Sequence, residues 1–148
     1  MRAVVQRVAR AAVRIEGETI AQIGPGLLVL VAISRDDRER EADTLAAKLA
    51  DLRIFENDSG KFDLSLRDIQ GEALLVSQFT LYADTRKGRR PSFTAAAEPS
   101  RAKELYSYLV DRFAGLGIPT RQGRFGAHME VDLVNDGPVT LVIEVEAD

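Results

Sequence analysis

Only two stretches of the sequence have the periodicity of an amphipathic helix, and both lie between runs of strand-like segments. The first falls within residues 42–50. The second opens at Glu98-Pro99-Ser100 and stops at Gly115 and Gly117. Their apolar stripes consist of Ala42, Leu45, Ala46, Leu49 and Ala50 in the first, and of Ala102, Leu105, Tyr106, Leu109 and Phe113 in the second. We therefore expect two main helices that each pack one face on a core.

The remaining apolar segments are short and bounded by turn residues, which is typical of strands. Strands are expected over residues 2–8, 11–15, 20–23, 27–33, 53–56, 73–82, 118–122, 129–135 and 139–146, with a hairpin turn at Asp136-Gly137-Pro138 between the last two. Strands and helices do not alternate as a doubly wound fold requires. The sequence thus predicts an α+β fold with a mixed or antiparallel sheet, formed by residues 1–148 as a single domain.

Composition disfavours several kinds of chemistry. The chain has no cysteine, which removes disulfides, thiolate nucleophiles and cysteine-ligated zinc. Its one histidine, His128, leaves little for a catalytic zinc site, and no cluster of Asp and Glu suggests a magnesium site. We expect no metal and no cofactor.

No segment has the pattern of a membrane anchor or a secretion signal. Arginines at positions 2, 7, 10 and 14 interrupt the N-terminal segment, and the longest apolar stretch, residues 27–33, is far too short to span a bilayer. The sequence predicts a cytoplasmic protein with no membrane partner.

A basic run contrasts with the formal net charge of −3. Arg86, Lys87, Arg89 and Arg90 follow a strand-like segment, with Gly88 between them. One interpretation is a solvated loop. The other is contact with a phosphodiester, since arginine binds phosphate in a bidentate manner and glycine lets the backbone approach closely.

Hydroxyl side chains lie toward the end of the segment 73–82. Both of its faces are apolar at the start and partly polar at the end, which fits a strand that leaves the core and enters a site. The alternative is a buried strand whose Ser77 and Thr80 hydroxyls bond to neighbouring backbone. Either hydroxyl would need a base to act as a nucleophile, and the sole imidazole is His128. No Gly-x-Ser-x-Gly elbow surrounds Ser77, so a serine-hydrolase triad has little support.

Two separated motifs resemble the signatures of a known family. Ser77-Gln78-Phe79-Thr80-Leu81 and Asn135-Asp136-Gly137-Pro138-Val139-Thr140 are similar to the motifs of the D-aminoacyl-tRNA deacylases of the bacterial and eukaryotic type, the D-Tyr-tRNA deacylase family. The similarity extends through the opening MRAVVQRV and the segments KGRRPSF and GRFGAHMEV, and so covers essentially the whole chain.

The resemblance implies an enzyme that hydrolyses the ester between a D-amino acid and the terminal ribose of tRNA, and that also cleaves glycyl-tRNA mischarged on tRNA(Ala). It implies a homodimer whose sheet is barrel-like across the dimer, with active sites at the subunit interface. There the Ser-Gln-Phe-Thr strand of one chain would meet the Gly137-Pro138 turn of the other. This turn, with a cis peptide bond, would reject L-aminoacyl-tRNA, which makes the activity a form of translation quality control.

The same resemblance implies roles for single residues. The backbone N–H groups around Phe79 and Thr80 would face the substrate carbonyl oxygen, and the Thr80 hydroxyl would lie near the substrate amine. Ser77 and Gln78 would hold the terminal adenosine. The basic residues Arg86, Lys87, Arg89 and Arg90 would bind acceptor-stem phosphates. The ribose 2′-OH would take part in the reaction, directly or through a water, with a hydroxyl nucleophile as the alternative.

Two other classes of function compete with this interpretation. A non-catalytic RNA-binding module would use the same basic loop and bind tRNA without cleaving the ester. A serine esterase would use Ser77 with His128 and react with fluorophosphonates.

Overall fold

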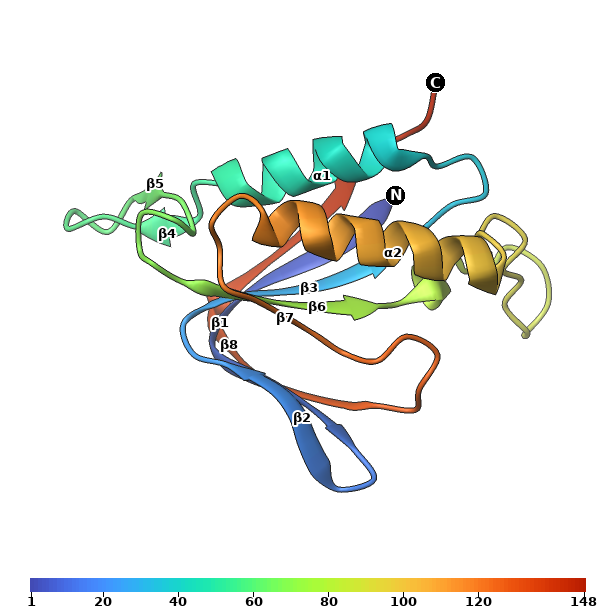
Figure 1. The fold of residues 1–148 in the computed structure, drawn as a ribbon, viewed down its shortest axis with the longest axis horizontal. Coiled ribbons are helices and arrows are strands. Elements are labelled where there is room, and N and C mark those ends of the chain that lie inside the picture. The colour runs from blue at the N-terminus through green and yellow to red at the C-terminus, as the bar shows by residue number, and fades with distance from the viewer.

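The fold is described for all residues, 1–148, in a computed structural model, and it combines a mixed sheet with two helices (Figure 1). The strands are β1 (Arg2–Ile15), β2 (Glu18–Ile23), β3 (Gly26–Ala32), β4 (Phe55–Glu56), β5 (Phe62–Leu64), β6 (Glu72–Ser77), β7 (Thr120–Gln122) and β8 (Glu130–Glu144). The helices are α1 (Glu39–Asp51) and α2 (Pro99–Ala114), and a single 3-10 turn, η1, spans Phe79–Tyr82. The predicted α+β class with a mixed sheet and two main helices is confirmed.

The long strand β1 organises the sheet. One of its edges pairs antiparallel with β3 and then with β2, while its other edge pairs antiparallel with β8 along almost its whole length. Beyond β3 the strands β6 and β7 add in parallel. The order is β2-β1-β3-β6-β7, and the sheet coils until it is nearly barrel-shaped (Figure 1).

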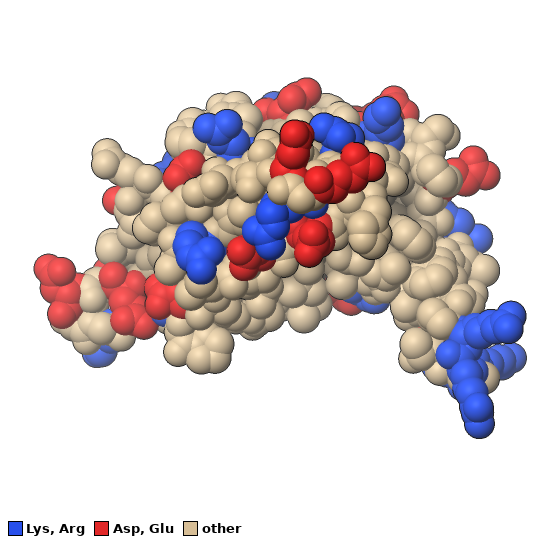
Figure 2. Space-filling model, turned by 90° about the horizontal axis from the view of Figure 1, so that it is seen from below, with Lys and Arg blue, Asp and Glu red and all other residues tan.

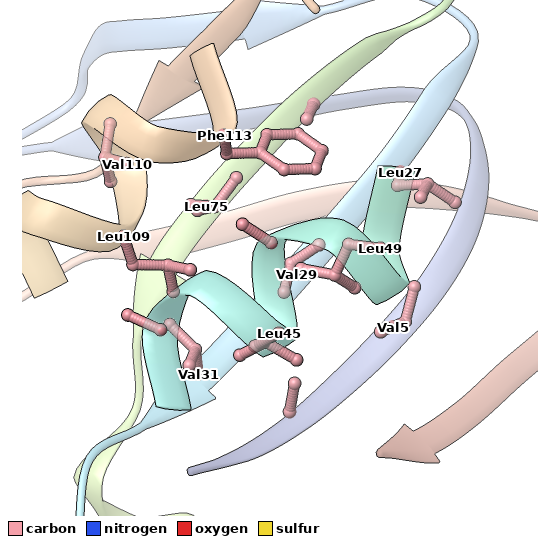
Figure 3. Packing of buried hydrophobic residues seen from close by; sticks show 14 of the residues in the cluster. Val5, Leu27, Val29, Val31, Leu45, Leu49, Leu75, Leu109, Val110 and Phe113 are labelled. Atoms are coloured by element: carbon pink, nitrogen blue, oxygen red, sulfur yellow. The ribbon is translucent and has the colours of Figure 1, made fainter. Parts of the chain in front are cut away.

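Both helices lie on the same face of the sheet, where they pack against each other and against its strands (Figures 1 and 3). All ten residues of the two predicted apolar stripes are buried. Leu45 and Leu49 of α1 meet Leu109 and Phe113 of α2 above the strand side chains (Figure 3). The helix pattern in the sequence therefore predicted the core correctly, since apolar burial along one stripe is what fixes an amphipathic helix.

The other face of β3 and β6 is buried as well. Leu28 and Leu74 belong to a second cluster, together with Val8, Val13 and Ile23 of the coiled β1–β2 pair. This explains why the segment 73–82 starts with apolar residues on both faces: a strand covered on both sides has no solvent face.

The predicted strand 73–82 is too long. β6 ends at Ser77, which pairs with Val31, and the Gln78 N–H makes a last bond to the Val31 carbonyl at 2.8 Å. β3 ends at Ala32, so no ladder is available further on, and the chain closes into the η1 turn instead.

The predicted hairpin at Asp136-Gly137-Pro138 is also wrong. The expected strands 129–135 and 139–146 form one strand, β8, which pairs with the same edge of β1 on both sides of this point. Val8 pairs with Asn135 and Gln6 with Thr140, so residues 136–139 bulge out opposite Arg7. β1, which was itself expected as two strands, is long enough to pair with both halves of β8, so the chain does not fold back at this point.

Smaller differences concern the ends of elements. The expected strand 53–56 shortens to β4, which forms a hairpin with β5, a strand not predicted.

Neither helix has the length and the apolar run needed to cross a membrane.

Candidate active site

A cavity of about 580 Å³ opens where β3 and β6 end. Its walls are mainly apolar and come from the ends of these strands, the start of α2, and the segments around Phe93 and Phe125. Ser77, Gln78 and Phe79 line it, so the structure brings three of the four predicted catalytic residues to one cavity. Thr80, the fourth, is exposed one residue further along the chain.

The η1 turn presents backbone N–H groups beside this cavity. Phe79 and Thr80 are its first two residues, and N–H groups at this position have no partner inside a helical turn. The Gln78 side chain does not cap them; its amide donates instead to the Thr80 hydroxyl. Two donors on adjacent residues can stabilise an oxygen that acquires negative charge.

The aromatic ring of Phe79 forms part of the cavity wall. It packs edge-on against Phe93, with ring centroids 5.0 Å apart, and Phe79 remains 57% exposed. A flat apolar group that entered here would meet one ring already fixed by its neighbour.

Ser77 and His128 both line the cavity, but no hydrogen bond joins them. His128 makes no side-chain hydrogen bond, so nothing orients it as a base toward Ser77. The arrangement lacks the nucleophile–base contact that defines a serine-hydrolase site. The residues described include no group of three or more His, Asp and Glu side chains placed to hold a metal ion.

The second motif forms the bulge in β8. Gly137 and Pro138 are both exposed, and the peptide bond between them is cis. The Asn135 side chain closes the bulge, because its oxygen accepts the Val139 N–H at 3.0 Å and its amide donates to the Thr140 hydroxyl at 2.9 Å.

Arg7 supports the bulge from the opposite strand. Although charged, it is only 6% exposed. Its Nε donates to the Asp136 carbonyl at 2.9 Å and its Nη1 to the Ile54 carbonyl at 2.9 Å, while Glu56 accepts a longer bond of 3.4 Å from Nη2. One guanidinium therefore ties the bulge to the segment before β4.

Arg7 was not predicted from the sequence as a residue that supports the second motif, although a signal was present. Ala3 and Val5 are completely buried, and period 2 places Arg7 on the same face of β1. An arginine that continues the inward face of a strand must find hydrogen-bond acceptors there, since burying an unpaired charge is costly. The alternation along β1 could therefore have predicted that Arg7 is buried, but not which acceptors it binds.

The basic residues lie on a projecting loop. Asp84 and Ser92 close its base through two backbone hydrogen bonds of 2.7 and 2.9 Å. In Figure 2 a dense group of blue side chains lies at one end of the molecule, the end where this loop projects in Figure 1, and a group of acidic side chains lies at the opposite end, with both colours mixed between them. Lys87, Arg89 and Arg90 are exposed and form no ion pair.

Arg86 differs from the other three. Its Nε and Nη2 bind the two carboxylate oxygens of Asp84 at 2.9 and 2.7 Å. The Arg86 side chain lowers the pKa of Asp84 to about 2, so the pair stays ionised at neutral pH. Arg86 thus organises the loop, while Lys87, Arg89 and Arg90 carry its uncompensated charge.

Comparison with known proteins identifies the family. Residues 4–144 match the family model described as D-Tyr-tRNA(Tyr) deacylase. The chain belongs to this deacylase family. A D-aminoacyl-tRNA deacylase of Symbiobacterium thermophilum is 54% identical over 99% of the chain and 97% of its own length. The family predicted from the two motifs, and the prediction of a hydrolytic enzyme, are confirmed.

Solved structures show the same deacylase fold. One named c-Myc DNA Unwinding Element Binding Protein superposes with a TM-score of 0.94 at 42% identity, and covers 99% of this chain and 100% of its own. Another, described as a probable eukaryotic D-amino acid tRNA deacylase, has a TM-score of 0.84 at 16% identity over 97% of this chain and 98% of its own. The second likeness concerns the fold alone.

The two deacylase motifs do not meet within one chain. Arg2 of β1 contacts Leu81 in η1, whereas Arg7, five positions later, contacts Asp136 in the bulge. At about 3.3 Å per residue along a strand, the Cα atoms of these two arginines lie roughly 16 Å apart. The cavity lining contains neither Gly137 nor Pro138.

Proposed function

We propose that this enzyme hydrolyses the ester bond of D-aminoacyl-tRNA and frees tRNA and the D-amino acid. The observation that supports this most directly is the η1 turn, which presents the Phe79 and Thr80 N–H groups beside an apolar cavity in a chain of the deacylase family. Glycyl-tRNA mischarged on tRNA(Ala) is also a substrate, since glycine lacks the side chain by which chirality is tested. Residues 1–148 act as one catalytic domain in the cytoplasm, where aminoacyl-tRNA is used.

The chemistry requires positioning more than a strong nucleophile. An aminoacyl ester is already activated, and its carbonyl oxygen becomes negative as the tetrahedral intermediate forms. The Phe79 and Thr80 N–H groups donate to this oxygen, which is the interaction that gains most strength in the transition state. With the ribose 2′-OH as activating group, a water adds to the scissile carbonyl, the ester C–O bond breaks, and the 3′-oxygen leaves as the 3′-hydroxyl after taking up a proton. In the direct alternative the 2′-OH itself adds and the 3′-hydroxyl leaves, and water then hydrolyses the resulting 2′-ester. The Gln78 amide fixes the Thr80 hydroxyl, which lies near the substrate amine.

The cavity takes the terminal adenosine. Its volume of about 580 Å³ and mainly apolar walls suit a flat base, with Phe79 and Phe93 as the aromatic contact. Ser77 and Gln78 supply polar groups at the end of β6 for the nucleoside. The ester is carried by the ribose of this adenosine, so binding the adenosine in the cavity places the ester beside η1.

A homodimer completes the site. The outer edge of β8 has no partner strand in the chain, and Val134 and Val142 on this strand are 39% and 66% exposed. Such an edge favours pairing with another chain. A second copy brings its Gly137-Pro138 bulge to the η1 turn, where it blocks an L side chain and leaves room for a D side chain.

The basic loop binds the acceptor-stem phosphates. Lys87, Arg89 and Arg90 are exposed on the loop that follows the η1 turn in the chain. Phosphate contacts of this kind orient a nucleic acid and contribute affinity without reading sequence.

A direct experiment measures the release of amino acid from D-Tyr-tRNA and from L-Tyr-tRNA by the purified protein and by Thr80→Ala. We expect cleavage of the D substrate only, with a lower rate for the variant. Thr44→Ala is the matched control, because Thr44 is an exposed threonine whose hydroxyl bonds only to its own helix, at the Arg40 carbonyl. Binding of tRNA without cleavage would favour a non-catalytic RNA-binding module, and labelling of Ser77 by a fluorophosphonate would favour a serine esterase.

A further inference from the structure

Arg2 makes two contacts at the far end of the η1 turn and one with β8. Its Nη1 donates to the Leu81 carbonyl at 2.7 Å, and its guanidinium carbon lies 4.8 Å from the centre of the Tyr82 ring. Its Nε donates to Glu144 of β8 at 2.6 Å, in an ion pair whose two side chains are 34% and 44% exposed. One side chain thus joins β1, β8 and η1.

We propose that Arg2 is a positioning residue for deacylation, which holds η1 so that the Phe79 and Thr80 N–H groups keep their direction. The inference rests on the proposed function, in which these two groups stabilise the developing oxyanion. Arg2 itself does not touch the substrate; it acts through the turn.

The distribution of contacts along η1 supports this role. Phe79 and Thr80, at the start of the turn, are exposed; the Phe79 ring packs on Phe93, and the Gln78 amide donates to the Thr80 hydroxyl. Leu81 and Tyr82, at its end, are partly buried and carry the contacts to Arg2. In a turn of four residues the orientation of the first two N–H groups follows from how the last two are held.

Tyr82 lies beside the buried N-terminus of the chain. Tyr82 is partly buried and lines a small cavity together with Ser34, whose N–H donates to Asp37 at 2.7 Å. Asp37 also accepts the buried Met1 ammonium at 2.8 Å. The guanidinium therefore contacts a partly buried ring, and removing Arg2 leaves the Leu81 carbonyl without this donor.

The test compares Arg2→Met, which keeps the stem and loses the donors, with Arg2→Lys, which restores one donor and the charge. For Arg2→Met we expect kcat on D-Tyr-tRNA to fall about tenfold, less than the 10²–10³ that loss of an oxyanion donor costs, because both donors remain but point differently. KM should change less than about twofold, since the adenosine and phosphate contacts are untouched. Arg2→Lys should recover most of kcat.

Arg10→Met is the matched control. Arg10 lies on the same strand and also pairs with a carboxylate of β8, Asp132 at 3.7 Å, but it makes no contact with η1. Its kcat and KM should equal those of the wild type. The amide resonances of Phe79 and Thr80 should shift in Arg2→Met and stay in place in Arg10→Met, with the melting temperature of both close to that of the wild type.

The outcomes separate the two proposals. A wild-type protein that does not cleave D-Tyr-tRNA overturns the proposed function. A wild type that cleaves it, together with an Arg2→Met variant of unchanged kcat, overturns only the role of Arg2. Loss of kcat in Arg2→Met that Arg2→Lys does not recover, accompanied by a lower melting temperature and shifts throughout the amide spectrum, would show that Arg2 is merely structural and would also overturn it.

Discussion

Replacing Arg7 by methionine should both destabilise the protein and reduce its preference for D over L substrates. Methionine keeps the apolar stem that packs in the interior, so the change removes mainly the guanidinium. The bulge then loses the Asp136 bond from β1, and the segment before β4 loses the bond to Ile54.

The magnitude follows from the burial of the two acceptors. A hydrogen bond to a charged donor contributes about 1.5–3 kcal/mol. Ile54 is only 5% exposed, so water cannot replace the donor to its carbonyl and the loss of that bond should cost most of this free energy. Asp136 is exposed, so water can replace the lost donor there. The Glu56 contact at 3.4 Å adds little, since that carboxylate is half exposed. We expect a loss of about 3 kcal/mol in the free energy of unfolding.

Urea unfolding measures the stability, and single-turnover deacylation of D- and L-Tyr-tRNA measures the preference. The ratio of the two rates should fall at least about tenfold, the equivalent of 1.4 kcal/mol, as the bulge loses its fixed position. Arg14→Met is the control: Arg14 lies on β1 and pairs with Asp132 at 3.2 Å at the surface, so its loss should cost less than about 1 kcal/mol and leave the ratio unchanged. An Arg7→Met protein with an unaltered ratio would refute the idea that this arginine positions the chirality test.

Three further results are expected. Exchanging Lys87, Arg89 and Arg90 for glutamine should raise KM and should reduce the slope of log KM against log salt concentration by about 2. Arg86→Gln should have a smaller effect, because Asp84 already balances the charge of Arg86. A tRNA that ends in 2′-deoxyadenosine should lose far more activity than the Thr80→Ala enzyme, and a trapped acyl-Thr80 adduct would contradict this. Burial raises the pKa of Tyr106, so the folded state keeps a proton that the unfolded state loses above pH 10. Stability measured by urea unfolding should therefore fall above that pH by up to about 1.4 kcal/mol per unit, and Tyr106→Phe should flatten this slope.

Elements whose information is local were predictable from sequence. The two helices could be predicted from their apolar stripes, to which Leu45 and Leu49 belong, because the buried face of a helix is formed by residues that are close together in the chain. The run Ser77-Gln78-Phe79-Thr80 was predicted as a site because its members are contiguous. A motif of adjacent residues needs no knowledge of the fold to be found.

Features that depend on a distant partner were not predictable. The end of β6 is set by where β3 stops, and the bulge in β8 exists because β1 continues past it. The residues 136–139 have the composition of a hairpin turn, and only the length of the opposite strand decides against one. Likewise, Phe93 and Phe125 reach the cavity from separate loops, and no spacing in the sequence relates them to Ser77.

The separation of the two motifs bears on how catalysis and selection depend on each other. The η1 turn is held by Arg2 near one end of β1, and the bulge by Arg7 farther along the same strand, so one rigid element sets the position of both. In the proposed homodimer, with a two-fold axis, the bulge of each chain would face the turn of the other, and the distance between them would be set by β1 and by the pairing of the chains. In the proposed function, backbone atoms of the bulge test chirality, so a displaced bulge would admit an L side chain. It is consistent with this demand that both motifs are anchored by buried or half-buried arginines to the longest antiparallel pair in the sheet, and not carried on free loops.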